Sequence, residues 1–116
     1  MVDNTVISDA HARTIKLLEA SGLCVQEEID FPPFRVDIYL PDYHVCIEVD
    51  GPHHSERANR LRDRELESVY HMPTFRINVS DIDGLGWLVP LTLLLGRAAV
   101  TKDARWKQCE LRTPWL

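Results

Sequence analysis

The sequence has few cysteines, no excess of basic residues and no long apolar run, and each of these absences excludes a class of protein. Its three cysteines, Cys24, Cys46 and Cys109, are widely spaced and form no C-x-x-C pair. Neither a disulfide framework nor a zinc knuckle is therefore predicted. We expect the chain to work in the cytoplasm or in another reducing intracellular compartment.

Signals for export and for membrane insertion are also missing. Met1 is followed by acidic and polar residues instead of a charged start and an apolar run, so no secretory signal is predicted. No apolar stretch reaches the length that crosses a bilayer. With 45% hydrophobic and 27% charged residues in 116 positions, the composition is that of one globular domain over residues 1–116.

Acidic residues outnumber basic ones. Thirteen Lys and Arg against eighteen Asp and Glu give a net charge of −5, whereas a self-sufficient nucleic-acid-binding protein usually presents a positive field. Tight nonspecific binding of DNA by this chain alone is therefore not expected. A local basic strip, a second domain or a partner would have to supply affinity for nucleic acid.

Hydrophobic periodicity predicts a layered domain with helices and strands in the order helix, strand, strand, helix, strand, helix. The core is expected over about residues 8–80, and an apolar helix and tail over 84–116. The expected elements are a helix over about 9–21, a short extended candidate over 23–29, strands over 34–40 and 43–50, a helix from 55 or 56 to about 70, a strand over 72–79, and a helix from about 85, kinked or started later by Pro90.

The two adjacent strands read as an antiparallel hairpin that gathers carboxylates. With the turn at residues 41–42, Asp37 faces Cys46. Glu48 then lies diagonally next to Asp37 on the same face of the sheet, about 7 to 8 Å away between backbones, and Asp50 continues the row. Three carboxylates on one face repel one another unless a cation lies among them, so this register predicts a Mg²⁺ (or Mn²⁺) site.

A site of this kind indicates phosphodiester chemistry. Mg²⁺ takes one or two protein carboxylates and completes its shell with water and substrate phosphate. A histidine from the pair His53 and His54 would orient or deprotonate the attacking water. The same alternation is also typical of the solvent face of an amphipathic hairpin. The ending "EVDG" before two histidines favours the functional interpretation.

The segment "RVDIYLPDYHVCIEVDGPHH", followed by "NRLRDREL" and "FRI", resembles the core of the PD-(D/E)XK nuclease superfamily, in the branch of very-short-patch-repair-like endonucleases. The likeness covers about residues 8–80, and residues 36–54 are its specific part. It implies an α/β fold with a restriction-endonuclease-like three-layer core, in which helices flank a small mixed sheet. It also implies a Mg²⁺-dependent endonuclease that cuts DNA in preference to RNA, with another domain or partner that supplies specificity.

The resemblance also implies roles for the matched acidic and histidine residues. Asp37 and Glu48 would hold Mg²⁺ or Mn²⁺ as the acidic residues of the first and second core strands. Asp50 stands where the standard motif has Lys, and it would assist the metal or His54. His54 matches the histidine of D-G-x-x-H and would help to activate water.

Two arginines and two further histidines complete the set of candidate residues. The resemblance implies that Arg62 and Arg76 contact phosphate or neutralise charge in the transition state. His11 and His53 are additional candidates for the site. The sequence departs from the family where His11 replaces the Glu that often stands in the first helix, and where Asn59 replaces a second Asp.

The same stretch is also similar to the RAP domain, a nuclease-like module of organellar RNA-processing proteins. The pattern S-x-x-H from Ser8 to His11 and the Pro52 of "DGPHH" favour this alternative. The "FRI" segment with Arg76, and the lack of a Trp soon after the third strand, favour the endonuclease branch. The RAP-like alternative implies a mitochondrial module that binds or processes RNA with weak or no catalysis.

Overall fold

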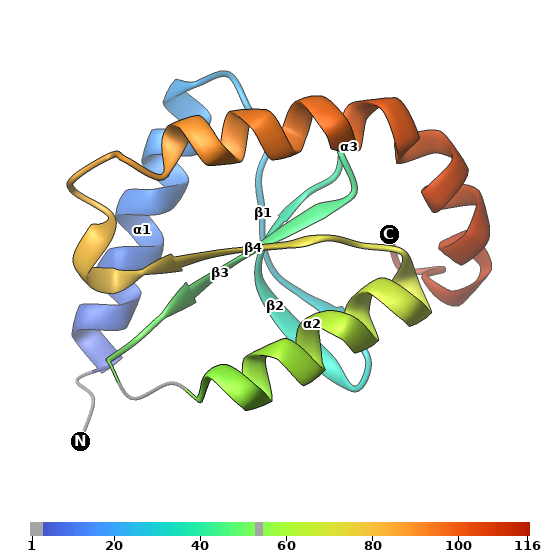
Figure 1. The fold of residues 1–116 in the computed structure, drawn as a ribbon, viewed down its shortest axis with the longest axis horizontal. Coiled ribbons are helices and arrows are strands. Elements are labelled where there is room, and N and C mark those ends of the chain that lie inside the picture. The colour runs from blue at the N-terminus through green and yellow to red at the C-terminus, as the bar shows by residue number, and fades with distance from the viewer. Residues whose placement is uncertain (1–3, 53–54) are drawn as a thin grey trace.

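The computed structural model of the chain describes residues 4–52 and 55–116. Within these ranges, a mixed sheet of four strands is flanked by three α-helices (Figure 1), which confirms the predicted small α/β layered fold. The elements are α1 (Asn4–Ala20), β1 (Gln26–Phe31), β2 (Phe34–Leu40), β3 (Val45–Asp50), α2 (Glu56–Tyr70), β4 (Thr74–Asn78) and α3 (Leu88–Cys109), with short 3₁₀ turns at Val79–Asp81 and Glu110–Arg112.

The strands lie in chain order across the sheet. β1 pairs antiparallel with β2, β2 antiparallel with β3, and β3 parallel with β4. The parallel pair requires a crossover connection, which α2 provides. The extended candidate at 23–29 corresponds to the strand β1, which begins at Gln26, continues to Phe31 and forms a hairpin with β2 through the turn at Pro32 and Pro33. The order of elements predicted from the sequence therefore lacked one strand.

Helices cover both faces of the sheet. One apolar cluster joins α1 and α3 to alternate β3 residues such as Ile47, and a second cluster joins α2 to Cys46. A strand covered on both faces reads as a nearly continuous apolar run, and β3, with the sequence VCIEVD, has this character. Glu48 is therefore buried because of its position in a central strand.

The last helix begins later than its apolar run. The sequence predicts a helix from about residue 85, whereas α3 begins at Leu88, with Pro90 in its first turn. The first N–H groups of a helix have no acceptor within the helix, so a proline is tolerated there. No helix among the described residues is long and apolar enough to cross a membrane.

The pairing of β2 with β3 differs from the predicted register by two residues. Tyr39 pairs with Cys46, whereas the sequence pattern placed Asp37 opposite Cys46. The connection is longer than predicted, because residues 41–44 all belong to the turn. A shift of two residues leaves every side chain on its predicted face. It moves Glu48 from a diagonal position to one beside Asp37, just beyond the last pair.

Candidate functional site

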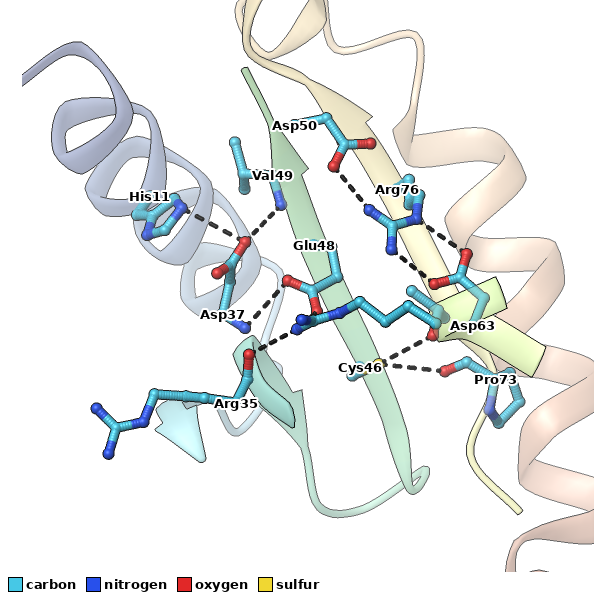
Figure 2. Close-up of polar contacts among 12 residues, drawn as sticks. His11, Arg35, Asp37, Cys46, Glu48, Val49, Asp50, Asp63, Pro73 and Arg76 are labelled. Carbon is cyan, nitrogen blue, oxygen red and sulfur yellow. Dashed lines mark hydrogen bonds and ion pairs between the residues drawn. The ribbon is translucent and has the colours of Figure 1, made fainter. Parts of the chain in front are cut away.

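Asp37 of β2 and Glu48 of β3 meet where the pairing of these two strands ends (Figure 2). The last pair joins Ile38 to Ile47. Beyond it, the backbone N–H of Asp37 donates to Glu48 Oε2 over 3.3 Å, and the backbone N–H of Val49 donates to Asp37 Oδ2 over 2.8 Å. Each carboxylate thus accepts a backbone hydrogen bond from the neighbouring strand in place of the regular ladder.

Glu48 is buried, with only 4% of its surface exposed. Its Oε1 accepts a hydrogen bond of 2.6 Å from Arg62 Nη2. Burial, followed by the negative charge of Asp37, raises the pKa of Glu48 to about 7, although Arg62 acts in the opposite direction. The ionised form of this carboxyl is therefore costly, and an additional cation would stabilise it.

His11 of α1 points toward Asp37 (Figure 2). Its Nε2 lies 3.5 Å from Asp37 Oδ2, a distance suited to an ion pair. The atom is nevertheless buried, and it has no hydrogen-bond partner among the described residues. Proteins rarely leave a buried polar atom unsatisfied, and a water or ion is the usual partner. The position next to Asp37 is therefore suited to a bound water, ion or substrate oxygen.

A second charged group, formed by Asp50, Asp63 and Arg76, lies beside the first (Figure 2). Arg76 donates to Asp50 Oδ1 over 2.7 Å, and to the two carboxylate oxygens of Asp63 over 2.7 and 2.9 Å. These bonds tie β3, β4 and α2 together. The carboxylate of Asp50 is thus directed to Arg76, and the bidentate pair of Arg76 with Asp63 holds the arginine in place.

The structure places some of the predicted residues together and leaves others undecided. Asp37 lies next to both Glu48 and His11, and Arg62 and Arg76 each form an ion pair with a predicted carboxylate. His53 and His54 lie outside the described residues.

Asp63 is not among the candidate residues predicted from the sequence, although it binds Arg76 at this site. Asp63 precedes the buried Leu66 by three positions and the buried Tyr70 by seven. This spacing places it on the inner side of α2, so helical periodicity would have found it.

The residues at this site suit a Mg²⁺ ion only if water and substrate supply most of its ligands. Among residues 4–52 and 55–116, no group of three or more His, Cys, Asp or Glu side chains is arranged to hold a metal ion. Mg²⁺ requires fewer, because it takes one or two carboxylates and keeps several waters. Asp37 Oδ1 accepts no hydrogen bond from the described residues and is therefore available. Asp37 and Glu48 would supply the two carboxylates of such a site.

Neither a family model, nor a curated protein, nor a solved structure matches this chain.

Proposed function

We propose that this chain is a metal-dependent endonuclease domain that hydrolyses phosphodiester bonds, of DNA in preference to RNA. The observation that carries the proposal is the contact between Asp37 and Glu48, carboxylates from neighbouring strands, of which Glu48 is buried with a raised pKa. Folding brings these two acidic groups together at a cost, and a hard cation with oxygen ligands is the usual compensation.

The fold supports the finer assignment to a restriction-endonuclease-like core. Both acidic residues stand on the central strands, β2 and β3, and helices cover both faces of the sheet. The motif residues therefore lie where the pairing of β2 with β3 ends, and side chains from these strands and from α1 converge there. This arrangement is consistent with the nuclease resemblance of residues 36–54.

Asp37 and Glu48 are the residues that would hold Mg²⁺ or Mn²⁺. The bound cation would polarise a phosphate oxygen and lower the pKa of a water molecule. His11 Nε2, 3.5 Å from Asp37 Oδ2 and without a hydrogen-bond partner in the described residues, would orient a water or take its proton. This assigns to His11 a role that the sequence also allowed for His54.

Arg62 and Arg76 provide positive charge beside the two carboxylates. Arg62 is 28% exposed at its side chain, so a phosphate group that approaches Glu48 reaches it. Guanidinium groups bind phosphate oxygens in a planar, bidentate manner. Since the chain carries a net charge of −5, we expect a further domain or partner to supply most of the affinity for nucleic acid.

The direct test is cleavage of duplex DNA, single-stranded DNA and RNA in Mg²⁺, in Mn²⁺ and in EDTA. We expect wild-type protein to cut DNA only with a divalent cation. Asp37→Asn and Glu48→Gln should each lower the rate by about 100-fold or more. Asp103→Asn removes an exposed carboxylate on α3 and is the matched control, with unchanged cleavage. Absence of cleavage by wild type in every condition, or undiminished cleavage by Asp37→Asn, would overturn the proposal.

A second candidate is an RNA-binding module that has a nuclease fold and no catalysis. It is favoured by the ion pairs of Arg62 with Glu48 and of Arg76 with Asp50, because the protein neutralises these carboxylates with its own cations. Such a module would bind RNA with the same Kd in EDTA and in Mg²⁺, and it would leave the RNA intact. An endonuclease would instead bind nucleic acid with a Kd that depends on Mg²⁺, and it would cut its substrate.

A further inference from the structure

The side chain of Arg62 is held at the candidate site by three contacts. Its Nη2 donates to Glu48 Oε1 and to the backbone oxygen of Arg35, each over 2.6 Å. Its guanidinium carbon also lies 4.9 Å from the centre of the Phe34 ring. Arg62 thus places a positive charge directly on the buried carboxylate that would contact a metal.

We propose that Arg62 is a built-in competitor of the divalent cation at Glu48, released when a phosphodiester binds. The inference rests on the proposed function, since it concerns the same site. In the protein without nucleic acid, the Arg62 guanidinium is bound to Glu48 Oε1. It would repel a divalent cation that binds the same oxygen. Metal binding to Glu48 therefore requires Arg62 to move away.

Arg62 is able to move in a way that Arg76 is not. Arg76 makes three hydrogen bonds to two carboxylates on separate elements, whereas Arg62 makes one bond to a carboxylate and one to a backbone oxygen. Arg62 is also partly exposed at the surface of α2. A phosphate oxygen offers its guanidinium an equivalent charged partner at this surface.

The exchange couples the two binding events. A phosphate that draws Arg62 away from Glu48 raises the affinity of the site for the cation, and by thermodynamic linkage the bound cation raises the affinity for phosphate by the same factor. The free chain consequently binds metal weakly, and its complex with nucleic acid binds metal tightly. Arg62 is a positioning residue in this scheme, because it acts through Glu48 and the phosphate.

The test is a calorimetric titration of the chain with Mn²⁺ in the absence of nucleic acid. Arg62→Gln removes the competing charge, and we expect the Mn²⁺ affinity to rise by about 5- to 150-fold, the usual range of coupling between two sites. Arg60→Gln removes the same charge from an exposed position two residues away, where Arg60 lies 3.9 Å from Glu56, and it should change the affinity by less than about twofold. Arg62→Lys keeps a competing cation and should remain close to wild type.

A measurement on the wild type tests the inference even if Arg62→Gln does not fold. The NMR resonances of the Arg62 guanidinium should change as Mg²⁺ saturates the site, because its bond to Glu48 Oε1 is lost. Guanidinium resonances that stay unchanged at saturation would overturn the inference, as would equal or weaker Mn²⁺ binding by Arg62→Gln.

The result is separable from that of the proposed function. Tighter Mn²⁺ binding by Arg62→Gln, together with no cleavage of nucleic acid by any variant, supports the competitor role of Arg62 and refutes the endonuclease. Metal-dependent cleavage by wild type, together with unaltered Mn²⁺ affinity in Arg62→Gln, supports the endonuclease and refutes the competitor role of Arg62. Absence of Mn²⁺ binding in both wild type and Arg62→Gln overturns both.

Discussion

Replacing Glu48 by glutamine should change the stability of the metal-free protein in a manner that depends on pH. Burial and the nearby charge of Asp37 raise the pKa of Glu48 from its ordinary value of 4.5 to about 7. Between these values the folded protein keeps a proton that the unfolded chain has lost, so wild-type stability falls as pH rises. At about 1.4 kcal/mol for each pH unit, the whole window is worth about 3.5 kcal/mol at most.

The assay is urea denaturation of wild type and Glu48→Gln in EDTA, at intervals from pH 4.5 to 8. The difference in unfolding free energy, variant minus wild type, should rise by up to about 3.5 kcal/mol toward pH 7 and then level off. Taking the difference cancels the titrating groups that do not interact with Glu48. Glu56→Gln replaces an exposed carboxylate, and its difference should stay within about 0.5 kcal/mol at every pH. A difference for Glu48→Gln that does not vary with pH would refute the reasoning.

Three further predictions concern stability, and denaturation measures each. Arg76→Gln leaves Asp50 and Asp63 without their shared cation and should lower the unfolding free energy by about 2 to 4 kcal/mol; an unchanged value would contradict the bridging role. Burial lowers the pKa of His44 from 6.5 to about 4, so the unfolding free energy should fall as pH falls through this window. His44→Gln should lose less stability over the same window. An identical dependence on pH in the variant and in wild type would exclude this role of His44. Ser55→Ala removes the N-cap bond of α2 and should lower the unfolding free energy by about 1 kcal/mol. An unchanged unfolding free energy would show that the cap does not stabilise the protein.

Much of the fold was predictable because local signals were strong. The strand at 34–40 has the predicted bounds, and the charged helix ends at Tyr70 as expected. β1 was only partly recognised, because the extended candidate at 23–29 began before Gln26 and stopped short of Asp30 and Phe31. The predicted hairpin register is wrong by two residues. Pro41 and Asp42 alone predict a complete turn, whereas the turn extends over residues 41–44.

The contact between Asp37 and Glu48 survives this error in register because a shift of two residues preserves the face of each side chain. Other features depend on contacts that no local pattern encodes. His44 is buried and hydrogen-bonded to the hydroxyl of Tyr39 and the backbone oxygen of Tyr70. Trp106 of the distant helix α3 packs against it, so the burial of His44 follows from the tertiary fold.

The partners of the arginines were hidden for the same reason. Along α2, arginines alternate with acidic residues, which favours pairs within the helix. Instead, Arg62 reaches Glu48 on β3, and Asp63 binds Arg76 on β4. These pairs require the helix to lie against the face of the sheet that carries Glu48 and Arg76, a relation that appears only once the crossover is formed.

The most direct measurement of the central claim is anomalous X-ray scattering from crystals of the protein grown with Mn²⁺. A Mn²⁺ peak in contact with an oxygen of both Asp37 and Glu48, with the Arg62 guanidinium displaced from Glu48 Oε1, is the predicted result. A structure obtained at a Mn²⁺ concentration that saturates the protein in solution, with no peak at these carboxylates and Arg62 still bound to Glu48, would contradict it.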